Sequence, residues 1–268
     1  MRRTIYLSCM NFHILLETFI ENWHIILLFF AVAVLYSSVG FGGGSSYLAI
    51  LALTGIVFTQ IRATALLCNI VVVSGNVYLF LHQKKVNFKK IMPLILFSIP
   101  LAFLGGTVKI NQQFFFILLG FTLLFAAITM WLSKQIVAFN EKNNDPKSIR
   151  NASFGGIIGF ISGMVGIGGG IFLAPLLHLT NWDTPQKIAA TASIFILVNS
   201  IAGFIGQYSM PNFLINWNLT GILLGTVFIG GQIGSRKSYS FFTPIQLKKA
   251  TAILIAFVSL RILYKYIF

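Results

Sequence analysis

The stretch Val39-Gly40-Phe41-Gly42-Gly43-Gly44 lies inside a long apolar run, and it recurs as Val165-Gly166-Ile167-Gly168-Gly169-Gly170 in the second half of the chain. Repetition at about half the chain length predicts two related halves. Glycine is unfavourable inside a helix, at about 1 kcal/mol relative to Ala. Irregular backbone at membrane depth is tolerated only where protein or a water-filled cavity covers it. The doubled phrase therefore predicts two broken helical segments facing one cavity, a pattern typical of secondary transporters.

The composition predicts an integral membrane protein with the lipid bilayer as its partner. Hydrophobic residues make up 57% of the chain, charged residues make up 9%, and the mean hydropathy is +0.87. Soluble domains carry about 25% charged residues. The net charge of +14 does not indicate nucleic-acid binding here, because basic residues in short loops orient a membrane chain.

Nearly uncharged stretches give the expected membrane spans. They cover residues 24–55, 63–81, 91–108, 114–132, 152–180, 188–208, 214–234 and 250–264. Most approach the ~20 residues that a span requires. The first and fifth hold the glycine phrases and reach about 30 residues, or about 45 Å as a continuous helix, which exceeds the hydrocarbon core. We therefore expect an all-α polytopic membrane protein in which these two segments break and turn.

The distribution of lysine and arginine orients these segments. Loops 82–90, 133–151 and 235–249 are rich in basic residues and are assigned to the cytoplasm, whereas 109–113 and 209–213 are assigned to the other side. Both glycine-containing segments are then hairpins, the first beginning and ending outside and the second inside. Each half becomes a hairpin plus three transmembrane helices, and the halves are inverted repeats. Single broken spans would instead give four crossings in each half and parallel repeats.

The predicted organisation has four parts. Residues 23–133 form the first transmembrane repeat and 152–268 the second, joined by a cytoplasmic linker over 134–151. Residues 1–22 are expected to form an N-terminal interfacial segment, because apolar residues there have the spacing of an amphipathic helix. Those apolar residues are Phe12, Leu15, Leu16, Phe19 and Ile20.

The paired phrases, with Pro175-Leu176-Leu177 after the second, resemble the sulfite exporter TauE/SafE family of membrane permeases. The similarity covers residues 24–268. It implies transport of small sulfur-containing oxyanions such as sulfite, thiosulfate or organosulfonates, without a cofactor, in a bacterial cytoplasmic (inner) membrane. The first half departs from the pattern by having Ala49 or Ile50 where the second has Pro175, which puts equal roles for the two hairpins in doubt.

The residues independently favour an anion. A glycine-rich reversal lets backbone N–H groups converge, and the following helix presents its positive end. Ser45 could add a hydroxyl donor. The glycines could instead serve only tight helix crossing. The candidate binding residues in the two phrases are Gly40, Gly42, Gly43, Gly44, Ser45, Gly166, Gly168, Gly169 and Gly170.

Polar residues on the helix after each hairpin are further candidates for substrate binding. They are Thr64, Asn69, Ser74 and Asn76 in the first half and Thr191, Ser193, Asn199, Ser200 and Gln207 in the second. Thr64 and Thr191 form the best repeat pair. Each could equally be an interhelical hydrogen-bond partner. Arg62 could attract the anion through its guanidinium or anchor the helix at the interface.

Acidic residues do not fall inside the predicted spans. The five in the chain are Glu17, Glu21, Glu141, Asp145 and Asp183. Carriers of metal cations and many proton-coupled carriers place such groups within the membrane. The spans also lack an acid–base or nucleophile–base pair. We therefore expect no metal site, no metal-cation substrate and no enzymatic activity.

Glycine pairs outside the phrases predict close helix packing. Gly105-Gly106 and Gly230-Gly231 with Gly234 recur on corresponding helices of the two halves. Small residues let helix backbones approach closely in membranes.

Two functions from different classes are compatible with these features. The first is a secondary transporter or facilitator that holds a sulfur oxyanion between the two glycine phrases. The alternative is a non-transporting membrane assembly or scaffold protein, whose polar residues would face other helices without a cavity joining the phrases.

Overall fold

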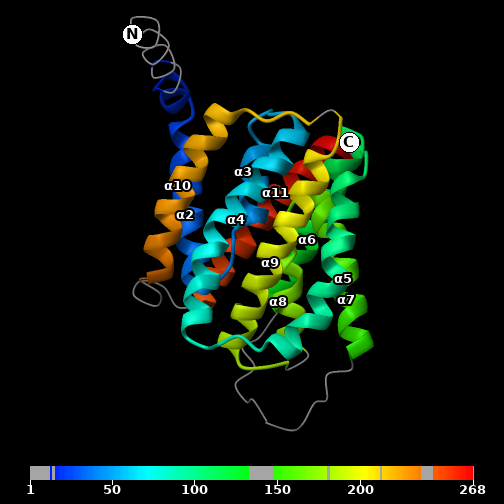
Figure 1. Ribbon diagram of the computed structural model, residues 1–268. Coiled ribbons are helices and arrows are strands. Elements are labelled where there is room, and N and C mark those ends of the chain that lie inside the picture. The colour runs from blue at the N-terminus through cyan, green and yellow to red at the C-terminus, as the bar shows by residue number, and fades with distance from the viewer. Residues whose placement is uncertain are drawn as a thin grey trace, which may run out of the picture.

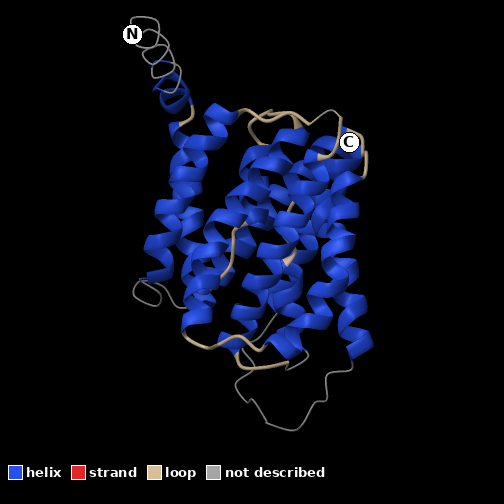
Figure 2. Cartoon of the chain, in the orientation of Figure 1, coloured by secondary structure: helices blue, strands red, loops and turns tan. Residues whose placement is uncertain are grey.

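The computed structural model describes residues 13, 16–132, 148–179, 182–211, 213–236 and 244–267, and this part is helical without strands (Figures 1 and 2). The helices are α2 (Trp23–Val39), α3 (Gly44–Ala52), α4 (Phe58–His82), α5 (Phe88–Thr107), α6 (Gln112–Leu132), α7 (Ser148–Val165), α8 (Gly170–Leu179), α9 (Pro185–Tyr208), α10 (Trp217–Arg236) and α11 (Pro244–Ile267). Each predicted span corresponds to one helix or, for the two long segments, to a helix pair. Most of the predicted interfacial segment and of the linker lies outside the described residues.

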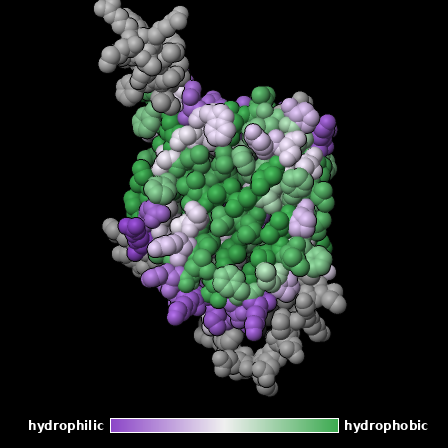
Figure 3. Space-filling view, viewed as in Figure 1, coloured by the Kyte–Doolittle hydropathy of each residue, from purple (hydrophilic) through white to green (hydrophobic). Residues whose placement is uncertain are grey.

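The surface of the bundle fits a bilayer. In the described part, four helices are long and apolar enough to cross a membrane, namely α4, α5, α6 and α9. Residues 23–39 and 153–165 form shorter apolar helices. Figure 3 shows a broad hydrophobic band across the middle of one face, with hydrophilic residues toward both ends. Soluble proteins rarely expose so large an apolar surface. The chain is therefore an integral membrane protein, as predicted.

Both long segments are broken at their glycines. Gly40 and Gly166 follow directly on the last residues of α2 and α7, and α3 and α8 begin at Gly44 and Gly170. The backbone has a positive φ at Gly40 (88°), Gly43 (84°), Gly166 (90°), Gly168 (84°) and Gly169 (79°). Residues with a Cβ rarely adopt this conformation, so glycine is required for the interruption. Figure 2 shows the breaks as short loop stretches inside the bundle. We call residues 40–43 the first break and 166–169 the second break.

The two broken segments enter the bundle from different ends. In Figure 1, α2 begins at the upper end and α3 returns toward it, where α4 begins. The helices α7 and α9 begin at the lower end, toward which α8 returns. Each segment is thus a helix, a break and a returning helix.

Close packing between α5 and α7 joins the two halves of the chain. Gly155, Gly159 and Gly163 recur every four residues on α7, and each lies directly against the backbone of α5. A Cβ built on Gly159 would lie only 2.6 Å from the carbonyl oxygen of Ser98. Such approaches leave no room for a side chain. The predicted packing role of Gly105 is confirmed at this contact, since its Cα faces the α7 backbone.

The contact of α10 with α2 has the same construction. Gly230 and Gly234 lie against the carbonyl oxygens of Phe30 and Val34. Glycines on α10 thus pack against α2 of the other half, just as α5 packs against α7. The predicted close packing at Gly230 and Gly234 is confirmed.

Candidate functional site

The side chain of Asn69 on α4 lies between the two breaks. It is fully buried, and its Nδ2 donates a hydrogen bond of 2.8 Å to the carbonyl oxygen of Ile167 in the second break. A Cβ on Gly168 would lie 2.8 Å from this Nδ2, and a Cβ on Gly42 would lie 2.5 Å from Oδ1. The breaks also approach each other directly, because a Cβ on Gly44 would lie 2.6 Å from the Ile167 oxygen. The structure therefore brings both glycine phrases together around one amide.

Each break also packs against the helix that follows the other hairpin, α9 for the first break and α4 for the second. A Cβ on Gly40 would lie 3.4 Å from Cβ of Ala189 on α9. A Cβ on Gly166 would lie 3.2 Å from Cα of Arg62 on α4. Arg62 and Ala189 occupy nearly corresponding positions of the two halves, so the halves interlock reciprocally.

A buried polar stripe runs along the face of α4 toward the breaks. Its members, Arg62, Asn69 and Asn76, are seven residues apart, which places them on one side of the helix. Arg62 Nη2 lies 3.3 Å from the carbonyl oxygen of Gly163, and Asn76 Nδ2 lies 3.4 Å from that of Phe41. Like Asn69, both side chains are buried and donate to backbone carbonyls of the hairpins.

A matching stripe on α9 consists of Ser193, Ser200 and Gln207, again seven residues apart and buried. The Ser193 hydroxyl donates to the carbonyl oxygen of Gly40. Ser200 Oγ faces the second break, 2.7 Å from a Cβ built on Gly168. Neither Ser200 Oγ nor Gln207 Nε2 has a hydrogen-bond partner in the described part of the chain. The α4 and α9 stripes therefore line the contact between the halves with polar groups, several of them unpaired.

The electrostatic character of this region is positive. The first N–H groups of α3 and α8 have no acceptor within their helices, and they carry the positive ends of the helix dipoles toward the breaks. Arg62 adds a full charge. Within the described residues the carboxylates lie elsewhere, and His, Cys, Asp and Glu form no cluster suited to a metal ion. The helix N-termini and Arg62 can therefore accommodate an anion.

The other predicted polar candidates have partners on helices. Thr64 Oγ1 lies 3.0 Å from Thr220 Oγ1 on α10. Thr191 and Asn199 each donate over 2.8 Å to a carbonyl oxygen four residues earlier in α9. Ser45 is buried in the first turn of α3. The structure thus places Asn69 against the glycines, whereas Thr64 contacts a neighbouring helix and Thr191 and Asn199 bond within α9.

The stripes contain four further residues that the sequence already suggested could line the path, namely Asn76, Ser193, Ser200 and Gln207, and their seven-residue spacing is visible in the sequence. Ser37 also lies near the breaks but was not among the candidates. Ser37 has no such signal. Its hydroxyl donates over 2.7 Å to the carbonyl oxygen of Gly231 and lies 2.9 Å from Asn76 Oδ1, which only the packing of α2 against α4 and α10 reveals.

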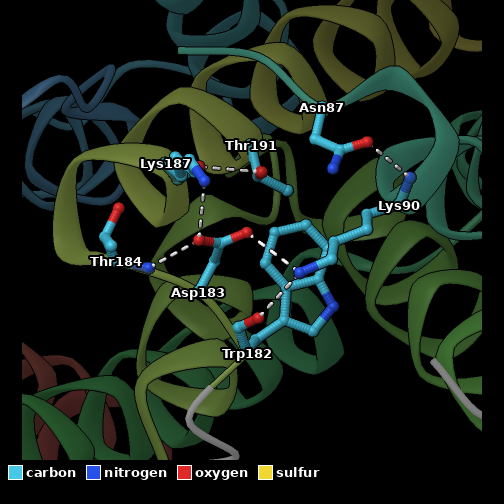
Figure 4. A network of polar contacts seen from close by, with 7 residues as sticks. All are labelled: Asn87, Lys90, Trp182, Asp183, Thr184, Lys187 and Thr191. Carbon is cyan, nitrogen blue, oxygen red and sulfur yellow. Dashed lines mark hydrogen bonds and ion pairs between the residues drawn. The ribbon is translucent and has the colours of Figure 1, made fainter. Parts of the chain in front are cut away.

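A separate ion-pair cluster lies where α9 begins (Figure 4). Asp183 is buried, with Lys90 Nζ at 3.0 Å and Lys187 Nζ at 3.3 Å from its carboxylate oxygens. Lys90 also lies over the Trp182 ring, 5.4 Å from its centroid. Burial raises the pKa of Asp183, but hydrogen bonds from the Thr184 N–H and the two lysines outweigh it and hold the pKa below its ordinary value. The cluster ties α5 of the first half to α9 of the second.

Asp183→Asn is expected to lower the apparent melting temperature in detergent by a few degrees at pH 7. The loss of partly exposed ion pairs reduces the free energy of unfolding by about 1 kcal/mol, which corresponds to a shift of this size. Because folding lowers the pKa of this carboxyl, its stabilisation is present above the unfolded pKa, about 3.9, and disappears as pH falls through the folded value. Thermal unfolding of the wild type and Asp183→Asn at pH 7 and at about pH 3 measures the difference between their melting temperatures. If this difference were the same at both pH values, the ion-pair role would be contradicted.

Comparison with known proteins identifies related sequences. A family model described as "Sulfite exporter TauE/SafE" matches residues 25–262. The chain is 32% identical over 245 residues to the "Probable membrane transporter protein y4hK" of Sinorhizobium fredii, which covers 89% of this chain and 96% of the relative. A "Probable membrane transporter protein YjnA" of Bacillus subtilis is 26% identical over 249 residues, 87% of this chain and 96% of the relative. No solved structure matches the chain.

Proposed function

Because the chain belongs to the sulfite exporter TauE/SafE family, we propose that this transmembrane transporter carries a small sulfur-containing oxyanion such as sulfite, thiosulfate or an organosulfonate. The observation that carries the proposal is the convergence of both glycine breaks on Asn69. We call this place, formed by Asn69 and the two breaks, the crossing. The substrate binds at the crossing, between the first turns of α3 and α8. A bacterial cytoplasmic membrane fits the bacterial relatives.

The chemistry of the crossing supports an oxyanion. Backbone N–H groups at two helix N-termini are suited to several oxygens on one small group. Glycine lets that group approach the backbone closely, at Gly43 and Gly169 among others. The described carboxylates lie away from the breaks, so the crossing does not repel an anion.

The arrangement of the two hairpins supports alternating access. The first hairpin begins and ends at the upper end of the bundle in Figure 1, and the second at the lower end. We interpret residues 23–133 and 152–268 as inverted repeats that rock against each other around the crossing. The lower end is cytoplasmic in this proposal, since the lysine-rich loop 83–87 lies there. Ion or substrate gradients supply the energy.

The test is radiolabelled sulfite flux in proteoliposomes containing the wild type, Gly43→Val or Gly169→Val. Both glycines have a positive φ, and a Cβ would lie 3.2 Å from the Tyr47 ring at Gly43 and 2.8 Å from the Phe195 ring at Gly169. Flux is therefore expected in the wild type and is expected to be lost in both variants. Gly55→Val is the matched control, because Gly55 also has a positive φ (75°) but lies in an exposed turn with open space around it.

The outcomes separate the alternatives. A wild type inactive with sulfite, thiosulfate and methanesulfonate would contradict the substrate class and favour a non-transporting assembly role. Flux that survives in properly folded Gly43→Val and Gly169→Val would leave a transporter but move the binding site away from the breaks.

A further inference from the structure

Arg62 is a buried charge that has no carboxylate partner among the described residues. Its residue is 2% exposed, and its one described hydrogen bond is the 3.3 Å contact to the Gly163 carbonyl oxygen. Its Nε has no partner. A guanidinium has five N–H donors and is not readily deprotonated, so the unpaired Nε leaves it able to donate to a further acceptor. Of the described carboxylates, Glu17 and Glu21 are exposed on the N-terminal segment, and Asp183 is paired with lysines at the other end of the bundle.

A second unpaired donor, Gln207 Nε2, lies at about the same height along the bundle as Arg62. A Cβ on Gly203 of α9 would lie 3.2 Å from Cα of Gly163 and 3.6 Å from Cδ1 of Leu66, so α9, α7 and α4 meet there. Arg62 is one helical turn from Leu66, and Gln207 is one turn from Gly203. The helices α4 and α9 run in opposite directions (Figure 1). Arg62, which precedes Leu66, and Gln207, which follows Gly203, therefore both lie one turn closer to the upper end than the residues that meet. Gln207 Nε2 is buried and unpaired.

This level is distinct from the crossing. Arg62 precedes Asn69 by seven residues, or about 10 Å along the helix. The guanidinium is held at this level by its 3.3 Å contact to the Gly163 carbonyl oxygen. Arg62 therefore lies between the crossing and the end of the bundle where α4 begins.

We infer that Arg62 and Gln207 form a second anion station, between the crossing and the upper end, and that it selects monoanions. The inference rests on the proposed function. An unpaired buried charge is costly, and a bound monoanion neutralises it while accepting the unused N–H donors. A dianion would leave one negative charge buried and unpaired. Bisulfite and alkylsulfonates meet this requirement, whereas the dianions sulfate, thiosulfate and fully ionised sulfite do not. Within the proposed substrate class, the station therefore favours bisulfite and organosulfonates over thiosulfate.

The test compares methanesulfonate with sulfate on the purified full-length protein. The readouts are the anion-dependent shift of the apparent melting temperature and flux in proteoliposomes. Methanesulfonate is expected to raise the melting temperature of the wild type and to be transported. Sulfate is expected to do neither. Arg62→Gln is expected to lose the methanesulfonate shift and at least about tenfold of the flux, the cost of one charge-assisted hydrogen bond. Arg62→Lys, which keeps the charge, is expected to retain the preference for the monoanion.

Arg261→Gln is the matched control, since Arg261 is exposed on α11 and the substitution is the same. Without anion, Arg62→Gln is expected to be at least as stable as the wild type, because it removes an unpaired buried charge. Clear destabilisation of Arg62→Gln with an unchanged methanesulfonate shift and flux would show a structural role and overturn the station alone. Equal responses of the wild type to sulfate and methanesulfonate would overturn the selectivity. A wild type that neither binds nor carries any of these anions would overturn the proposed function as well.

Discussion

Sulfite flux is expected to fall about a hundredfold in Asn69→Leu, while the protein remains folded. Leucine branches at the same carbon as asparagine and has the same number of side-chain heavy atoms, but it is bulkier and lacks the hydrogen-bonding groups. The substitution removes the 2.8 Å bond to the Ile167 carbonyl oxygen and leaves that oxygen unpaired between the breaks. It also removes the polar group that faces Gly42, Gly44 and Gly168. Losing a hydrogen bond to a charged substrate, at about 1.5–3 kcal/mol, accounts for a factor of this size.

The measurement is initial flux in proteoliposomes at matched protein content, with size-exclusion profiles to verify folding. Asn218→Leu is the matched control, because Asn218 is exposed in the first turn of α10, away from the breaks. Undiminished flux in monodisperse Asn69→Leu would show that the amide is only a packing contact.

Gly159→Leu is expected to prevent accumulation of a monodisperse protein. Gly159 lies at the centre of the contact between α7 and α5, and any Cβ there would lie 2.6 Å from the carbonyl oxygen and 2.8 Å from Cα of Ser98. These are backbone atoms of a neighbouring helix, so the helices must separate to admit a side chain. Overpacking costs about 1–3 kcal/mol or more, and separating α5 from α7 also weakens the contact between the halves.

Gly225→Leu provides the contrast. Gly225 is also a glycine within a membrane helix, α10, but open space surrounds it, with nothing within 4 Å of its Cβ position. Since leucine is a better helix former than glycine, this variant is expected to be neutral or slightly stabilised. Size-exclusion chromatography and thermal unfolding in detergent compare the two. Similar profiles for Gly159→Leu and Gly225→Leu would refute the close-packing account.

The positions of the breaks could be predicted because their cause is local. Glycine adopts the positive φ of Gly40 and Gly166 without steric cost, whereas residues with a Cβ rarely do, whatever surrounds them. The spans could be predicted for a similar reason, since hydrophobicity over a bilayer thickness is a property of the local sequence. The glycines of α5 and α10 were also identified, because close helix contact demands small residues.

The hydrogen-bond partners of the polar residues could not be predicted from the sequence. Thr64 and Thr191 were paired by their positions in the repeat, but the hydroxyl of Thr64 meets Thr220 and that of Thr191 bonds within its own helix. Arg62 could have been an interfacial anchor, yet it is buried beside the second break. Which partner a polar side chain finds depends on neighbouring helices that are distant in sequence.

By itself the sequence determined that this protein lies in a membrane, where its helices run and where two of them must break, because hydrophobicity and glycine act on the chain locally. Only the tertiary structure decided that both breaks meet at Asn69 and that each packs against the other half's following helix. It also decided that Arg62 has no carboxylate partner among the described residues. These features arise from contacts between residues about a hundred positions apart, and such contacts are set by how whole helices pack rather than by any local pattern.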